Sequence, residues 1–193
     1  MTKAIVFDCF GVLTTEGWIA FRNQYFANQP QKLDKANQLL HRLDRGRYSY
    51  DIFIDDIAQL SGVPSQEVRA RLDDNVPNRP LLEYIGNHLK GKYKIGMLSN
   101  AGDNWLETIF ETAQLKMFDE IALSYETGHL KPHPEAYHQI AERLGALPSE
   151  VILLDDQPRH CEGAKAAGMK AILYRDFSQA KADLEKLLAN PEA

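Results

Sequence analysis

The sequence predicts an α/β protein in which a doubly wound parallel sheet carries an all-helical insertion. Apolar segments suited to buried strands alternate with segments of helical periodicity along most of the chain. This alternation indicates right-handed βαβ crossovers and therefore a parallel sheet. One long interval, between the first and second expected strands, has helical patterns only, and this interval predicts the insertion.

The first expected strand is the β-branched run that begins at Lys3 and ends at Asp8. Gly11 follows closely and supplies a turn signal. In open α/β sheets, ligands bind just beyond the carboxyl ends of the strands, and Asp8 stands at such an end. Taken alone, Asp8 is equally consistent with a residue that only turns the chain. The other strand ends decide between these interpretations.

Residues 15–77 are predicted to form the helical insertion, which we call the cap. Apolar residues recur there at helical spacing in four segments with no strand pattern between them. Pro30 is expected to end the first helix, and Ser49 is expected to cap the third. The remaining residues, 1–14 and 78–193, are assigned to the α/β core.

Beyond the cap, strands and helices alternate to the C-terminus. Each expected strand is short, apolar and bounded by turn or polar residues, as buried parallel strands are. The strands are expected at 93–98, 121–123, 151–154 and 170–174, and the helices at 81–89, 105–110, 134–144, 159–167 and 178–188.

Composition excludes several classes of protein. The 193 residues carry a net charge of −5 and no long basic run, which argues against a nucleic-acid partner. No apolar stretch approaches membrane-spanning length, so no membrane association is expected. The first strand starts within three residues of the N-terminus, which leaves no room for a signal peptide. The two cysteines cannot form a disulfide framework, and a cytoplasmic protein is expected.

Polar and charged residues follow several of the expected strands. Because such strand ends meet at one edge of a parallel sheet, we expect these residues in one crevice: Asp8, Ser99, Asn100, Lys131, Asp155 and Asp156. Crowded carboxylates resist ionisation unless a cation lies among them, and oxygen ligands suit Mg²⁺. A hydroxyl, an amide and a lysine can hold phosphoryl oxygens, and a free carboxylate can attack phosphorus to form an aspartyl-phosphate.

Four motifs in this order resemble those of the haloacid dehalogenase (HAD) superfamily, with a helical cap between the first and second motifs. The resemblance covers the whole chain and implies a Rossmann-like core. The motifs are Phe7-Asp8-Cys9-Phe10-Gly11-Val12-Leu13, Leu98-Ser99-Asn100, Gly128-His129-Leu130-Lys131-Pro132-His133-Pro134-Glu135-Ala136-Tyr137 and Leu153-Leu154-Asp155-Asp156.

The resemblance implies a role for each of these site residues. Asp8 would be the nucleophile and a Mg²⁺ ligand, together with Asp156 and the backbone carbonyl of Phe10. Ser99 and Asn100 would bind the phosphoryl group, and Lys131 would neutralise its charge. Asp155 would be an acid behind the metal ligands. The expected substrate is a small phosphorylated metabolite, and the expected assembly is a monomer or a homodimer.

Phe10 departs from the phosphatase pattern of the superfamily. Those enzymes usually have a second aspartate at this position, which protonates the leaving group and then activates water. General acid–base help is worth about 10²–10⁴-fold in rate, so its loss should matter most for poor leaving groups such as sugar alkoxides. A water molecule or a cap residue could replace it, and Glu16 is the nearest candidate in the sequence.

Two alternatives to a Mg²⁺-dependent phosphatase remain open. Haloacid dehalogenases similarly carry an aromatic residue at the position of Phe10, because a halide needs no proton to leave. They work without metal, and their fourth motif is typically not an acid pair, so Asp155 and Asp156 favour the phosphatase. The second alternative is a protein that binds a phosphorylated ligand or a partner with little or no turnover.

Overall fold

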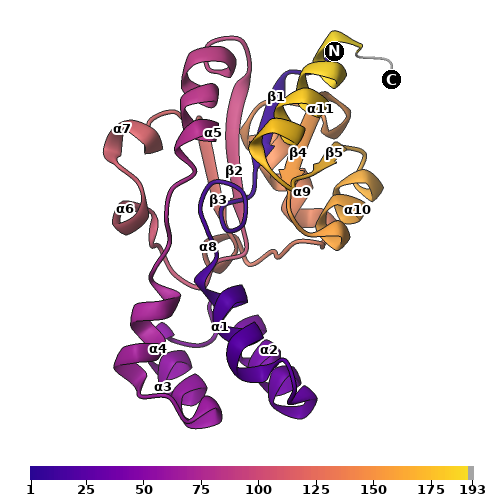
Figure 1. Cartoon of the computed structure of the whole chain (residues 1–193). Helices are drawn as coiled ribbons and strands as arrows, with labels where there is room; N and C mark the ends of the chain where they lie inside the picture. The colour runs from indigo at the N-terminus through magenta and orange to yellow at the C-terminus, as the bar shows by residue number, and fades with distance from the viewer. Residues whose placement is uncertain (191–193) are drawn as a thin grey trace.

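The predicted fold class is confirmed by a computed structural model that describes residues 1–190 (Figure 1). Its five-stranded parallel sheet has the order β3-β2-β1-β4-β5. The strands are β1 (Ala4–Phe7), β2 (Lys94–Ser99), β3 (Glu120–Leu123), β4 (Val151–Asp155) and β5 (Lys170–Leu173). Because β1 is central, its carboxyl end lies between those of β2 and β4.

Both faces of the sheet are covered by helices, which explains why the central strands are almost continuously apolar. Alternate residues of β1 enter two different cores, with Ile5 and Phe7 on one face and Ala4 and Val6 on the other. Helices α5 (Arg79–Tyr84) and α11 (Phe177–Ala189), with the π-helical turn η1 (Ile85–Leu89), pack on the first face. Helices α9 (Pro134–Arg143) and α10 (Pro158–Ala166) pack on the second.

Shorter helices complete the core connections. They contain too few residues for a full helical repeat of apolar positions, so the sequence pattern did not separate all of them from loops. They are α6 (Leu106–Ile109), α7 (Thr112–Leu115), α8 (Ser124–Thr127) and the 3₁₀ turn η2 (Pro148–Glu150).

The cap contains four helices that lie together at one end of the molecule (Figure 1). They pack around their own apolar cluster, which includes Trp18, Phe21, Leu43, Phe53 and Val68. This separate cluster supports the proposed division into a cap and an α/β core. The helices are α1 (Gly17–Phe26), α2 (Pro30–Asp44), α3 (Tyr50–Ser61) and α4 (Ser65–Leu72).

The local signals in the cap acted mostly as expected. The Ser49 hydroxyl accepts a hydrogen bond from the N–H of Ile52, which confirms the predicted cap of α3. The prediction for Pro30 was wrong: α1 ends at Phe26, and Pro30 is the first residue of α2. Proline is tolerated at that position because the first N–H groups of a helix have no partner within the helix.

The two chain crossings between cap and core run side by side. Thr14 and Pro77 form an antiparallel bridge, and the N–H of Thr15 donates to the carbonyl of Val76. The N–H of Val76 donates in turn to the Thr15 hydroxyl at 2.8 Å. We call these paired crossings, residues 14–15 and 76–78, the linker ribbon.

The described part of the chain, residues 1–190, has no helix with the length and apolar character that a bilayer crossing requires.

A close approach of α10 to the loop before α9 leads to the first prediction. A Cβ atom on Gly163 would lie 2.7 Å from Cβ and 2.8 Å from the carbonyl oxygen of Pro132. We expect Gly163→Ala to lower the free energy of unfolding by about 1–3 kcal/mol, as overpacking does.

The measurement is urea unfolding, with Gly86→Ala in η1 as the matched control. A Cβ there would meet only the Met117 sulfur, at the end of a flexible side chain. Equal stability of the two variants would contradict the packing that we describe.

Candidate active site

Three neighbouring strands bring their polar ends to one edge of the sheet. Asp8 directly follows β1, Ser99 is the last residue of β2, and Asp155 is the last residue of β4. The strand order β2-β1-β4 places Asp8 between the other two. The carboxyl edge of the sheet thus gathers these residues as the sequence predicted.

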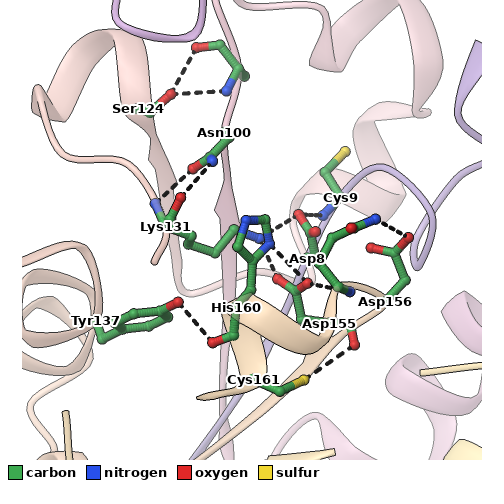
Figure 2. Close-up of polar contacts among 12 residues, drawn as sticks. Asp8, Cys9, Asn100, Ser124, Lys131, Tyr137, Asp155, Asp156, His160 and Cys161 are labelled. Carbon is green, nitrogen blue, oxygen red and sulfur yellow. Dashed lines mark hydrogen bonds and ion pairs between the residues drawn. The ribbon is translucent and has the colours of Figure 1, made fainter. Parts of the chain in front are cut away.

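Lys131 reaches this edge in a different way from the one expected. It does not follow a strand directly, because α8 lies between β3 and the loop that carries it. The Asn100 side chain holds this loop: its Oδ1 accepts from the N–H of Lys131 at 2.8 Å, and its Nδ2 donates to the Lys131 carbonyl at 3.0 Å (Figure 2). Asn100 therefore positions Lys131.

The Lys131 ammonium lies between two carboxylates. Its Nζ is 2.7 Å from Oδ1 of Asp8 and 2.6 Å from Oδ2 of Asp155, and its side chain is completely buried (Figure 2). The other oxygen of Asp155, Oδ1, is 3.0 Å from Nδ1 of His160 and accepts from the N–H of Gln157. Both oxygens of Asp155 therefore have partners within the protein. Of the two acids that contact Lys131, the nucleophile candidate Asp8 is the more exposed.

These contacts separate the acidities of the group. Burial raises the pKa of Asp155, but the Lys131 ammonium and the hydrogen bond from His160 outweigh burial and hold the pKa below its usual range. Burial lowers the pKa of Lys131, but Asp155 and Asp8 together raise it above the ordinary value. Both shifts favour an ammonium–carboxylate pair next to Asp8.

The site holds more negative than positive charge. Burial raises the pKa of Asp8, and the Asp155 carboxylate raises it further, despite the opposing effect of Lys131. Burial and Asp155 also raise the pKa of Asp156. A further cation next to Asp8 and Asp156 would favour their ionised forms.

The donor set near Asp8 fits Mg²⁺. Gly11 has a φ of +83°, and a Cβ on it would lie 2.6 Å from Oδ2 of Asp156, so this carboxylate packs directly against the loop that contains Phe10. Carboxylate and backbone carbonyl oxygens from Asp8, Asp156 and Phe10 match the oxygen preference of Mg²⁺.

A second group of potential ligands comprises Asp8, Asp155 and His160, whose ligand atoms lie within 4.8 Å of one another. Its two carboxylates already share the ammonium of Lys131. The charge that a cation would supply between them is therefore present already. This favours Asp8 and Asp156 as the acidic ligands of a bound Mg²⁺.

A cavity of about 850 Å³ opens between the cap and this edge of the sheet. Asp8, Phe10, Asn100 and Asp156 line it. Ser99, Lys131 and Asp155 lie behind the lining, and the Ser99 hydroxyl is buried without a hydrogen-bond partner among the described residues. The predicted site residues thus divide into a layer that faces the cavity and a buried layer beneath it.

Several cavity residues were not identified from the sequence. His160, which is largely buried beside Asp155, lines the cavity together with Arg22, Asp44 and Arg159. No local motif marks them, because their positions depend on how the cap docks onto the core. The only sequence signal for His160 was that polar residues precede it in the segment 157–160, directly after Asp156.

Aromatic rings form one wall of the cavity and cross from the core to the cap. The ring of Phe10 meets Trp105 edge-to-face at 5.9 Å, and Trp105 meets Tyr50 of α3 edge-to-face at 5.3 Å. A hydrogen bond of 2.6 Å from the Ser124 hydroxyl to the Asp44 carbonyl joins cap and core at a second place. The cap is therefore docked over the site.

A parallel sheet with buried acidic and basic groups at its carboxyl edge, below a large cavity, is the arrangement of an α/β enzyme. A family model described as haloacid dehalogenase-like hydrolase matches residues 2–168. The chain belongs to this family and is a hydrolase of the HAD superfamily, as the motifs predicted.

Curated relatives include phosphatases. The chain is 27% identical over 206 residues to a D-ribitol-5-phosphate phosphatase from Bacteroides thetaiotaomicron, with 97% of this chain and 99% of the relative covered. It is 32% identical over 126 residues to the rat bifunctional epoxide hydrolase 2, with 60% of this chain and 22% of the relative covered. The pig protein of the same name is covered over 38% of its length, so the chain spans only a fifth to two fifths of these two relatives.

Solved structures share the fold. A HAD family enzyme from Bacteroides thetaiotaomicron, in complex with magnesium and inorganic phosphate, has a TM-score of 0.71 at 24% identity, with 93% of this chain and 99% of that chain covered. An L-2-haloacid dehalogenase from Xanthobacter autotrophicus, with chloropropionic acid covalently bound, has a TM-score of 0.66 at 21% identity, with coverage of 100% and 85%.

The buried ammonium leads to the second prediction. Lys131→Met would leave Asp8 and Asp155 without their shared cation, and we expect a loss of about 3–5 kcal/mol in the free energy of unfolding at neutral pH. Without the ammonium, both carboxyl groups have folded-state pKa values above those of the unfolded chain. The penalty then grows as pH rises, so the variant should lose less stability at pH 5 than at pH 7.5.

The measurement is urea unfolding at both pH values in the presence of a chelator. The control is Lys90→Met, which removes a partly exposed partner of Asp119 and should cost about 1 kcal/mol or less. A Lys131→Met penalty that is small, or that decreases with rising pH, would contradict the electrostatic account.

Proposed function

We propose that this protein is a Mg²⁺-dependent phosphatase that acts on a small phosphorylated metabolite through an aspartyl-phosphate on Asp8. The observation that carries this proposal is the charge pattern at the floor of the cavity. Asp8 and Asp156 face the cavity, while the one buried ammonium among residues 1–190, that of Lys131, is already shared by Asp8 and Asp155. Such a floor needs a further cation before it can bind a phosphate dianion.

The proposal gives each residue a task. Asp8 attacks phosphorus, and its bond to Lys131 keeps one carboxylate oxygen in place. Asp8, Asp156 and the Phe10 carbonyl would hold Mg²⁺, which supplies positive charge to the phosphoryl oxygens. Lys131 offsets the remaining charge. Asp155 and Asp8 hold Lys131 in its charged form, and His160 bonds to Asp155. The Ser99 hydroxyl, which has no partner among residues 1–190, would bind a phosphoryl oxygen. Asn100 would use only its second Nδ2 hydrogen for this, because the rest of its amide is bonded to the backbone of Lys131.

The comparisons are consistent with this assignment. A relative that this chain matches over nearly its whole length is named for the hydrolysis of a sugar-alcohol phosphate. A structure with the same fold was solved with magnesium and inorganic phosphate. The cavity of about 850 Å³ is within the range that small-molecule sites occupy. We propose a cytoplasmic setting, because Cys9 and Cys161 are both free and buried.

One observation favours a second candidate function, a metal-independent 2-haloacid dehalogenase. Phe10 lines the cavity two residues beyond Asp8 and packs against Trp105, so that position offers no proton to a leaving group. A halide needs none. Asp8 would then displace halide from carbon in place of attacking phosphorus.

The third prediction tests the proposed function. We expect phosphate release from acetyl phosphate and from sugar phosphates that requires Mg²⁺ and is abolished by a chelator. Asp8→Asn should abolish turnover, because an amide cannot form the aspartyl-phosphate. The measurement is phosphate release for both proteins with and without Mg²⁺.

Each alternative gives a different pattern in this assay. Halide release from a 2-haloacid that depends on Asp8 and ignores the chelator would replace the phosphatase by the dehalogenase. Tight phosphate-ester binding without any Asp8-dependent turnover would indicate a binding protein.

A further inference from the structure

The phosphatase proposed above lacks a proton donor at the expected place. Phe10 stands two residues after Asp8 and has no ionisable group. Acetyl phosphate releases acetate, which leaves readily as an anion. A sugar or sugar-alcohol phosphate releases an alkoxide, which leaves slowly unless it is protonated. A phosphatase for alcohol phosphates therefore needs an acid from elsewhere in the chain.

The fold places Glu16 next to the loop that contains Phe10. Phe10 and Thr14 form a parallel bridge, and the N–H of Gly11 donates to the Thr14 carbonyl at 2.8 Å. Glu16 follows two residues after Thr14, directly beyond the linker ribbon and at the start of α1. It lines the same cavity as Asp8, Phe10 and Asp156.

The Glu16 carboxyl has no structural task among residues 1–190. It stands at the N-cap position of α1, but its side chain does not accept a hydrogen bond from that helix. In the described part of the chain, this carboxyl also has no other hydrogen bond and no ion pair. A half-buried carboxyl in a cavity, with no hydrogen-bond partner of its own, is available to a ligand.

We propose that Glu16 is the general acid and base of this enzyme. In the first step an Asp8 oxygen bonds to phosphorus, the bond between phosphorus and the alcohol oxygen breaks, and Glu16 gives its proton to that oxygen. In the second step water bonds to phosphorus, Glu16 takes a proton from that water, and the bond between Asp8 and phosphorus breaks. Alcohol and phosphate leave, and Asp8 and Glu16 return to their initial forms.

The charges that face Glu16 support this role. Burial raises the pKa of Glu16 to about 7, the Asp156 and Asp44 carboxylates also raise it, and Arg22 and Lys131 lower it. Near neutral pH, a group with this pKa is present in both its protonated and its ionised form. A group that gives and then regains a proton works best under that condition.

Asp44 is the only other acid on the cavity wall whose pKa is raised to about 7, among the residues that the structure describes. Burial raises its pKa, whereas Arg159 and Lys131 lower it, and its backbone carbonyl is tied to Ser124 at the end of α2. The charges that shift its own pKa are cations, although its carboxylate also acts on Glu16. Among residues 1–190, no hydrogen bond joins Asp44 to the loop of Phe10. Asp44 is therefore the matched control.

The fourth prediction compares two leaving groups in Glu16→Gln and Asp44→Asn, each with Mg²⁺ present. For a sugar phosphate, we expect Glu16→Gln to lower kcat/KM by about 10²-fold or more. For acetyl phosphate, kcat/KM should change little, because acetate leaves without a proton. The kcat for acetyl phosphate should fall, and phosphorylated Asp8 should accumulate, because the second step still needs a base.

The acetyl phosphate reaction keeps the two proposals distinguishable. Wild-type turnover of acetyl phosphate that requires Asp8 and Mg²⁺ supports the phosphatase whatever happens at Glu16. Turnover of acetyl phosphate by a variant shows that this variant is folded. Asp44→Asn should change kcat/KM for both substrates by the same factor. Glu16→Asp should recover part of the kcat/KM for the sugar phosphate that Glu16→Gln loses.

Three results would overturn the role of Glu16. One is an equal loss of kcat/KM for both substrates in Glu16→Gln, and another is no loss of kcat/KM for either substrate in that variant. The third is a loss confined to sugar phosphates in Asp44→Asn. Absence of Asp8-dependent phosphate release from the wild-type protein would remove the proposed phosphatase and this role with it.

Discussion

The site is built around one buried ammonium group. Lys131 joins the carboxyl ends of β1 and β4 through Asp8 and Asp155, although it comes from a loop outside the sheet (Figure 2). Two carboxylates at this depth would strongly oppose each other's ionisation without that charge. Three further contacts hold Lys131 in this position. Asn100 bonds to its backbone, His160 bonds to Asp155, and α10 packs against the loop at Gly163.

The sequence predicted the sheet because its strands carry strong local signals. Apolar runs of strand length end at Asp8, Asn100 and Asp155, and parallel pairing follows from the helices between them. Helix boundaries were less predictable, since Pro30 is compatible with the end of one helix and the start of the next. The four-residue helices α7 and α8 are shorter than any periodic pattern, so only tertiary packing defines them.

The candidate site was predictable as far as it depends on strand ends and motifs. The sequence did not show which site residues would face the cavity and which would be buried beneath it. That division depends on how the cap docks onto the core. Asn100 shows the limit: a residue assigned to the phosphoryl group has both ends of its amide bonded to the backbone of Lys131. Glu16 was identified only as the nearest acid, and its position beside Phe10 comes from the bridge to Thr14.

The linker ribbon also determines how the cap can move. Sliding of one crossing past the other would break the paired hydrogen bonds between Thr15 and Val76, whereas tilting about the ribbon preserves them. A tilt displaces atoms in proportion to their distance from the axis. The contact between Tyr50 and Trp105 would therefore open widely, while Glu16, beside the axis, would barely move. Such a hinge would let ligands in and out at the rim and would keep Glu16 and Phe10 in the same relative position from one opening to the next.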